Sequence, residues 1–183
     1  TFGADTHSTN FGVVCLAEDF APLVDVLADA LRRPLFPARH VEQVSQQRLV
    51  ELQERDEDTG SVANLCFYEA LFGRDHPYGR SVSGYVETVA RLQKADLQAF
   101  YKTHFTPDQG VIVVTGAVDT GDVLDMLAAR LGDWRGAPAD RVGLAPPAVL
   151  GSAPGRIVAP LAGKVQADIV LGAPAAARSH PDF

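Results

Sequence analysis

The feature that most constrains the fold is a continuous run of β-branched residues, Val111-Ile112-Val113-Val114. A short apolar run of this kind is typical of a strand whose two faces are both covered by other elements. Asp119 or Thr120 can cap a helix after this run, and Gly132 supplies the C-terminal signal of that helix. The run therefore predicts a sheet with helices packed against it.

Four other segments carry the three- and four-residue spacing of apolar side chains that predicts amphipathic helices. They lie after Asp19, at about 39–58, at 62–72 and at about 94–103. Asp19 is placed to cap the first helix, and Pro34 and Pro37 to end it. Its apolar stripe is formed by Phe20, Leu23, Val24, Leu27, Ala28 and Leu31.

Three further segments predict strands. Residues 9–17 form the first, and 156–161 and 165–171 form a hairpin joined by Ala162-Gly163-Lys164. Between these strands, residues 136–155 are rich in Pro, Ala and Gly, which is the composition of a linker. The order strand, four helices, strand, helix indicates an α+β fold, with a boundary at the linker.

The net charge of the chain argues against two classes of binding partner, nucleic acids and anionic membranes. The 183 residues include 16 Lys plus Arg and 23 Asp plus Glu, for a formal net charge of −7. Such a surface repels phosphate backbones and anionic lipids, so neither nucleic acid nor a membrane is an expected partner. Cys15 and Cys66 lie in apolar patterns and are expected to be buried free thiols. Free thiols and an acidic composition favour the cytoplasm without fixing the compartment.

Ordered motifs run through the first part of the chain: Leu31–Pro37, His76–Arg80 with Gly84 and Glu87-Thr88, Asp96–Tyr101 with Thr106-Pro107, Val111–Val118, and Gly132-Asp133-Trp134. In identity and order these motifs resemble the M16 zinc peptidases, the insulinase and mitochondrial-processing-peptidase-like family of inverted zincins. They cover most of residues 20–135, and their combination is specific although no single motif is. Gln166 and the segment Arg178-Ser179-His180-Pro181-Asp182-Phe183 are similar to the opening of the second half of such proteins.

The resemblance implies a LuxS/MPP-like α/β sandwich of antiparallel strands with helices packed on one face, repeated in two homologous halves. Residues 1–135 would be the later portion of the first half, 136–155 the linker between halves, and 156–183 the opening strands of the second half. The first residue is not Met and no closing element follows the last predicted strand, so an excised segment of a longer polypeptide is expected. Partners would be the remaining M16 halves or a homologous subunit, and a peptide substrate in the parent protein.

Catalysis in this family requires His-x-x-Glu-His on one helix, in which two imidazoles bind zinc and the Glu activates a water. The 183 residues contain no such motif, so no catalytic residue is assigned and no zinc is expected to bind this chain. A third zinc ligand, a Glu on a later helix, falls by resemblance on Glu51. The supporting Glu seven residues earlier is replaced by Val44, and Glu54 offers a competing register.

The remaining polar residues have plainer interpretations. Glu51 also belongs to an acidic, solvated helix face, and His76 lies in a His-Pro-Tyr-Gly segment where Pro77 and Gly79 shape a turn, Gly79 by allowing a positive φ. Arg178 resembles a position that neighbours the substrate chamber in the family.

Three functions follow as hypotheses. The favoured one is a fragment of an M16 zinc-dependent peptidase that is inactive alone. The second is a non-catalytic M16 paralogue that serves as a scaffold or regulatory subunit, which Val44 supports. The third is an unrelated α+β binding module.

Overall fold

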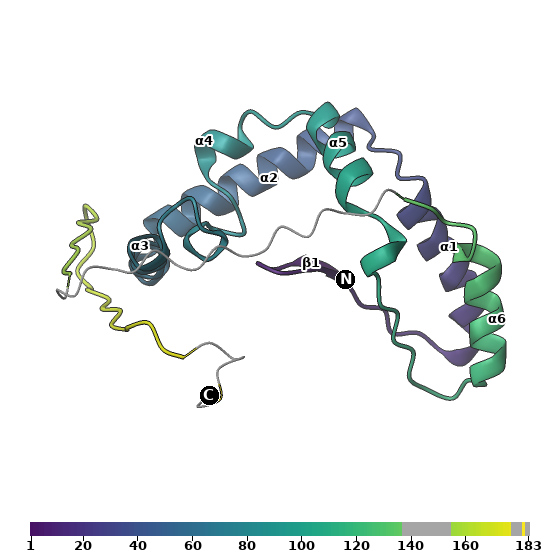
Figure 1. Cartoon of the computed structure of the whole chain (residues 1–183). Helices are drawn as coiled ribbons and strands as arrows, with labels where there is room; N and C mark the ends of the chain where they lie inside the picture. The colour runs from purple at the N-terminus through teal and green to yellow at the C-terminus, as the bar shows by residue number, and fades with distance from the viewer. Residues whose placement is uncertain (137–154, 177–180, 182–183) are drawn as a thin grey trace. The chain divides into compact units, whose positions relative to one another are not determined.

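The computed structural model describes residues 1–136, 155–176 and 181 (Figure 1). Helices dominate these residues, and one small two-stranded sheet accompanies them. The elements are β1 (Phe2–Ala4), β2 (Thr9–Phe11), α1 (Phe20–Arg32), α2 (Ala38–Glu57), α3 (Thr59–Phe72), α4 (Val86–Val89), α5 (Lys94–His104) and α6 (Thr120–Leu131). Short 3₁₀ helices are η1 (Ala17–Asp19), η2 (Pro77–Gly79) and η3 (Pro107–Gln109).

The chain divides into two compact units. The first unit comprises residues 1–3, 10–43 and 92–141, and therefore holds α1, α5 and α6. The second comprises residues 4–9, 44–91 and 142–183, and holds α3, η2, α4 and most of α2.

The predicted helices are confirmed, with ends shifted by a few residues. Asp119 caps α6 as predicted, because its Oδ1 accepts hydrogen bonds from the backbone N–H of Gly121 at 2.8 Å and of Asp122 at 3.1 Å. The prediction for Asp19 is wrong, since its side chain makes no capping hydrogen bond and its backbone is already helical. The short helix α4 was not predicted, because four residues are too few to show a helical period.

The strand predicted for Val111-Ile112-Val113-Val114 is not formed within the described residues. Val111 is 84% exposed and Val113 is 79% exposed, so the face of the run that carries these two side chains is not covered. A strand is defined by hydrogen bonds to a neighbouring strand, and no other described segment pairs with this one. The local sequence sets the preference for a strand, but only a partner strand could satisfy it.

The same reason applies to the other predicted strands. Residues 9–17 form a strand only at Thr9–Phe11, where β1 lies beside it in a hairpin. The predicted hairpin at 156–161 and 165–171 shows its turn, with Gly163 at φ +74°, but no strand pairing among the described residues. Most of the predicted linker at 136–155 lies outside the described residues.

In the first unit α1 packs against α6. The buried side chains of Val24, Ala28 and Leu31 line α1, and Val123 is buried on α6. The hydroxyl of Tyr101 on α5 donates a hydrogen bond to the carbonyl oxygen of Leu31, 2.7 Å away, which fixes α5 at the end of α1. This arrangement confirms the inward face predicted for α1 from its apolar spacing.

Two ion pairs also hold α1 to α6 and to the residues that follow α6. The Arg32 guanidinium lies 2.8 Å from the Asp133 carboxylate, and Arg130 pairs with Asp25. Hydrogen bonds from these guanidinium groups lower the pKa of both carboxyl groups below the ordinary value of 3.8. Because all four side chains reach solvent, each pair contributes little to stability.

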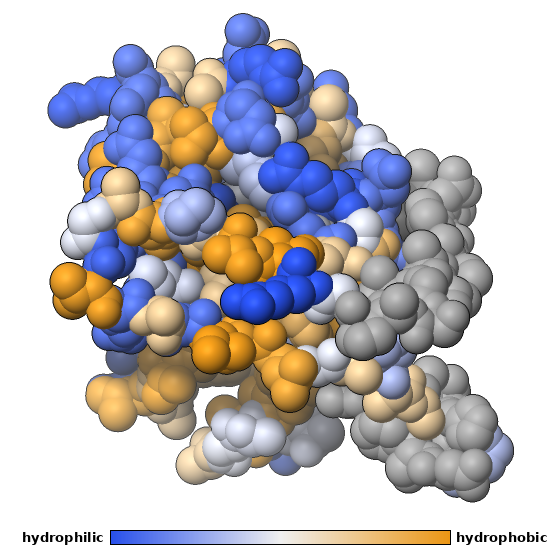
Figure 2. Space-filling view, turned by 90° about the vertical axis from the view of Figure 1, so that its left-hand side faces the viewer, coloured by the Kyte–Doolittle hydropathy of each residue, from blue (hydrophilic) through white to orange (hydrophobic). Residues whose placement is uncertain are grey.

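Many apolar side chains remain at the surface, and Figure 2 shows several of them, in orange, between hydrophilic residues. Cys15 is also exposed, which corrects the expectation that both thiols are buried, and Cys66 is half-buried. Both are free, as predicted. Among the described residues no helix is long and apolar enough to cross a membrane.

The ion pairs predict an acid-sensitive first unit. A carboxyl group whose pKa is lowered by folding stabilises the fold above its ordinary value of 3.8, and loses that contribution as the pH falls through the lowered value. Asp133→Asn and Asp25→Asn should therefore each destabilise the protein slightly at pH 7 and reduce by the same small amount the stability that is lost as the pH falls to 3 and below. Urea unfolding at both pH values measures this. The control is Asp125→Asn, an exposed residue of α6 without an ion pair among the described residues; an equal effect there would contradict the assignment.

Candidate functional site

The residue predicted to be a zinc ligand, Glu51, lies in the middle of α2. Its Oε1 accepts a hydrogen bond from Gln47 Nε2 at 3.1 Å, and its Oε2 lies 2.8 Å from the Arg48 guanidinium. Val44 lies two helical turns earlier on the same face and is 62% exposed. The carboxylate is thus half-exposed and contacts side chains of its own helix, and its role as a ligand stays a prediction.

The other predicted site residues do not join Glu51. Glu54 is exposed on α2, three residues further along, and Arg178 lies outside the described residues. A zinc site with an open position requires three protein ligands. In the described ranges no group of three or more His, Cys, Asp or Glu side chains could hold a metal ion. The residues that the structure describes therefore contain no complete zinc site.

The His-Pro-Tyr-Gly segment forms a tight turn after α3, built on η2. His76 is buried, its Nδ1 accepts a hydrogen bond from the backbone N–H of Tyr78 at 3.1 Å, and its ring stacks on Phe72 with the centroids 5.4 Å apart. The imidazole therefore caps the turn.

The backbone of Gly79 packs against that of Gly73, and a Cβ on Gly79 would lie 2.0 Å from the Gly73 carbonyl oxygen. Gly79 serves this close approach rather than the positive φ that was expected; the positive φ, +78°, occurs at Gly73.

A polar network fixes the far end of this loop to α3. The Tyr85 hydroxyl donates a hydrogen bond to Glu69 Oε1 at 2.8 Å, and Arg74 Nε lies 3.0 Å from the same oxygen. The Arg74 guanidinium also lies over the Tyr85 ring, 4.2 Å from its centroid. The hydrogen bond to Glu69 raises the pKa of Arg74 above its ordinary value, so the cation is permanent.

Arg55 on α2 contacts the same loop. Its Nη1 donates hydrogen bonds to Ser81 Oγ at 3.0 Å and to the Gly84 carbonyl oxygen at 2.8 Å, while its Nη2 lies 2.7 Å from the Asp56 carboxylate. Its side chain is only 17% exposed. Residues 73–85, which we call the turn loop, are therefore held by both α2 and α3.

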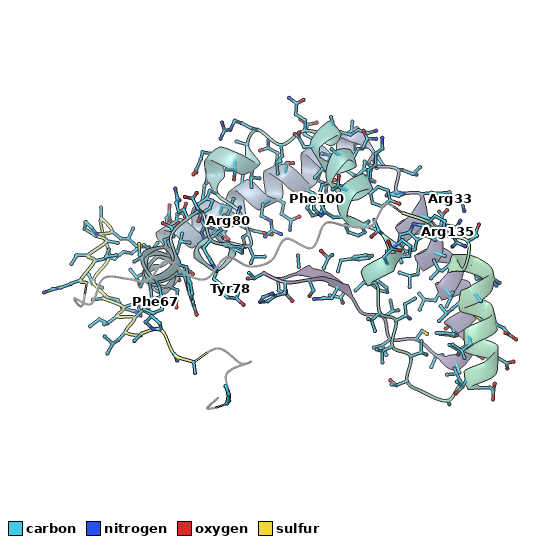
Figure 3. All side chains as sticks on the ribbon, viewed as in Figure 1. Arg33, Phe67, Tyr78, Arg80, Phe100 and Arg135 are labelled. Atoms are coloured by element: carbon cyan, nitrogen blue, oxygen red, sulfur yellow. The ribbon has the colours of Figure 1, made fainter. Side chains whose placement is uncertain are left out.

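The turn loop and α3, together with Arg55 of α2 and with Thr6, line an open hollow with a volume of about 670 Å³. This is within the range of pockets that bind small ligands. Its walls are largely apolar and aromatic, with Tyr68 and Phe72 from α3 and Tyr78 from the turn loop. Arg80 also lines it, and Figure 3 labels Tyr78 and Arg80 beside α3.

With this geometry in place, comparisons with known proteins assign the family. The profile of a family described as "Peptidase M16 inactive domain" matches residues 91–183, which is just over half of the chain. The chain belongs to the M16 peptidase family. Its α+β fold is that of the family.

Individual relatives agree. The chain is 32% identical to an uncharacterized zinc protease of Mycobacterium tuberculosis over 131 residues, which are 72% of this chain and 30% of that protein. It is also 32% identical over 121 residues to the probable mitochondrial-processing peptidase subunit beta of Arabidopsis thaliana, covering 66% of this chain and 23% of that protein. A crystal structure of a peptidase M16 inactive domain from Pseudomonas fluorescens superposes with a TM-score of 0.65 at 22% identity, over 73% of this chain and 32% of that chain.

The chain thus spans less than a third of the length of these relatives. The names of the two relatives describe a zinc protease and a subunit of a processing peptidase. The resemblance to the M16 family that the sequence motifs indicated is confirmed.

Sequence reasoning identified the turn loop as structural but missed the network around Tyr85 and the hollow. Tyr85 lies sixteen residues after its acceptor Glu69, too far for any helical spacing to connect them. The aromatic residues of the His-Pro-Tyr segment and the preceding α3 were the available signal. Their clustering depends on how the turn loop folds back on α3.

The packing of Gly79 on Gly73 predicts that Gly79→Ala is strongly destabilising. The new methyl group would clash with a carbonyl oxygen that cannot move without opening the turn, and overpacking of this kind costs roughly 1–3 kcal/mol. Chemical denaturation measures the loss. Gly12→Ala is the matched control, since a Cβ there meets nothing within 4 Å; equal losses in the two variants would refute the close-contact explanation.

The hydrogen bonds of the Tyr85 hydroxyl lead to a second prediction, a smaller loss of stability in Tyr85→Phe. Tyr85→Phe removes the hydrogen bond to Glu69 and the one accepted from the backbone N–H of Ser81, and should lower the free energy of unfolding by about 1 kcal/mol. Tyr68→Phe provides the comparison, because the Tyr68 hydroxyl has no hydrogen bond among the described residues. Thermal unfolding of both variants should show a drop for Tyr85→Phe alone.

Proposed function

We propose that this chain is a non-catalytic portion of an M16 zinc-dependent peptidase, and that it is inactive alone. The observation that carries the proposal is the absence of any His-x-x-Glu-His in the 183 residues of a chain that belongs to a zinc peptidase family. The reaction of the parent would be hydrolysis of peptide bonds. Its two imidazole ligands and its general base would come from residues other than these.

Glu51 is proposed as the contribution of this chain to the zinc site of the parent. When bound, the metal would supply the Lewis acid and activate the attacking water. Glu51 suits a ligand role because its carboxylate is anionic, half-exposed and held by Gln47 and Arg48 rather than buried in a core. Arg178 is proposed to neighbour the substrate chamber, together with the opening of the second M16 half.

The layout of the parent is part of the same proposal. Residues 1–135 would belong to the first M16 half, 136–155 to the linker, and 156–183 to the opening strands of the second half. The exposed apolar side chains of the Val111–Val114 run and of residues 165–171 support it, because they would be covered if other parts of the two halves completed the sheets. The partner is then the remainder of these halves or a homologous subunit.

One residue, Val44, supports a second candidate function, that of a non-catalytic M16 subunit. Val44 occupies the position where an acidic side chain would support the zinc ligand from two turns away, and a valine cannot do so. If the parent also lacks the histidine pair, the chain would belong to a scaffold or regulatory M16 subunit.

The zinc proposal predicts that Glu51→Gln in the intact parent lowers its zinc content and its peptidase activity, because the third ligand loses its negative charge while the two imidazoles stay in place. A carboxamide is a much weaker ligand than a carboxylate, so a loss of at least tenfold in zinc affinity is expected. Metal analysis after dialysis and cleavage of a quenched peptide measure the two effects. The isolated chain should hold no stoichiometric zinc and cleave nothing.

Glu54→Gln is the matched control, three residues away on the same helix, and should keep its zinc. Zinc loss in Glu54→Gln but not in Glu51→Gln would move the ligand to Glu54. An intact parent without zinc and without activity would support the scaffold function and refute the peptidase proposal.

A further inference from the structure

The hollow beside the turn loop differs in charge from the rest of the molecule. The protein carries a formal net charge of −7, yet both charged residues that line the hollow, Arg55 and Arg80, are arginines. No Asp or Glu of the part of the chain that the structure describes lines it. An anionic group would therefore meet attraction here and repulsion over most of the remaining surface.

The two arginines are not equivalent. Arg55 is largely buried and already binds Asp56, Ser81 and the Gly84 carbonyl oxygen. Arg80 is exposed, directly follows η2, and has neither an ion pair nor a side-chain hydrogen bond with any residue that the structure describes. Its guanidinium is the cation that remains available to a ligand. Guanidinium groups match carboxylates through two parallel hydrogen bonds.

The apolar wall is built from aromatic rings that are already in contact. Phe72 stacks on Tyr68 with centroids 6.3 Å apart and meets Tyr78 edge-on at 5.3 Å. Tyr68 and Tyr78 are both exposed, so one side of this cluster faces outward. Such a surface buries an aliphatic or aromatic side chain favourably.

A polar group also lines the hollow. Asn64 on α3 lines the hollow, and its Nδ2 donates a hydrogen bond to the Gly60 carbonyl oxygen at 2.9 Å. Its amide oxygen and second N–H are left for a ligand. An amide at this position is suited to a peptide bond, which offers one donor and one acceptor.

We propose that the hollow binds the C-terminal residue of a peptide, with the terminal carboxylate on Arg80 and an aliphatic or aromatic side chain against Tyr68, Phe72 and Tyr78. The inference rests on the proposed function for the source of the ligand, since hydrolysis of a peptide bond releases a fragment with a new terminal carboxylate. Inorganic phosphate would match the charge but would leave the aromatic wall without a partner. The class of ligand is therefore a peptide with a free, apolar C-terminus.

The test is direct binding to the intact protein, with a chelator present so that no peptide is hydrolysed. Fluorescence anisotropy would compare labelled Gly-Gly-Gly-Phe as the free acid, the same peptide as the C-terminal amide, and labelled Gly-Gly-Gly-Gly as the free acid. The free acid ending in Phe should bind at least about tenfold more tightly than either of the others, because it alone offers both groups. Its affinity should fall as salt is raised.

Arg80→Gln should weaken the free acid about tenfold and bring it within about twofold of the amide. Arg91→Gln is the matched control: it makes the same change of charge at an exposed residue outside the hollow and should bind as the unchanged protein does. Equal thermal unfolding of the two variants would exclude misfolding as the cause, and Arg80→Lys should retain part of the preference for the acid.

Three results would overturn the proposal: no binding of the free acid at millimolar concentration, an unchanged acid-to-amide ratio in Arg80→Gln, or displacement of the peptide by equimolar phosphate. None of them depends on activity. A parent that binds the peptide but never cleaves one would contradict the proposed function alone.

Discussion

The contact of the Gly79 backbone with Gly73 is the constraint on which the second unit depends. It turns the chain back onto α3 at the end of that helix, and it allows no side chain at position 79. The imidazole of His76 then caps the turn, and Tyr85 bonds Glu69 a short distance along the loop. The side-chain hydrogen bonds depend on the backbone contact, because their donors and acceptors are close together only where the chain turns back at Gly79.

Much of the fold could be predicted from the sequence where local forces decide it. Helical spacing located α1 and α6, and an Asp before a helix located the cap at Asp119. The strands could not be predicted in the same way. Val111–Val114 has the composition of a buried strand, but a strand needs hydrogen bonds from another segment, and the described residues provide none. Secondary structure that depends on distant partners cannot be read from a local pattern.

The candidate site also combines features that the local sequence predicts with features that depend on distant residues. Glu51 was placed on a helix face by its resemblance to a family motif, and it does lie on α2, beside Gln47 and Arg48. Its role as a metal ligand depends on side chains that these residues do not include. The hollow escaped prediction for a different reason: its lining comes from α2, α3 and the turn loop, and no spacing in the sequence brings Tyr68, Tyr78 and Arg80 together. Only the reversal at Gly79 does so.

Arg55 connects the two parts of this unit. It lies one turn after Glu51 on α2, so both side chains lie on the same face of the helix. Its hydrogen bonds to Ser81 and Gly84 hold the turn loop, and the same guanidinium lines the hollow. A shift of α2 that repositioned Glu51 would therefore pull on the turn loop through Arg55. Conversely, a ligand that ordered the turn loop would restrict the helix that carries Glu51. The coupling is stiff because giving up the hydrogen bonds to Ser81 and Gly84 would leave Nη1 of a largely buried guanidinium without a partner, even though Asp56 would still pair the charge.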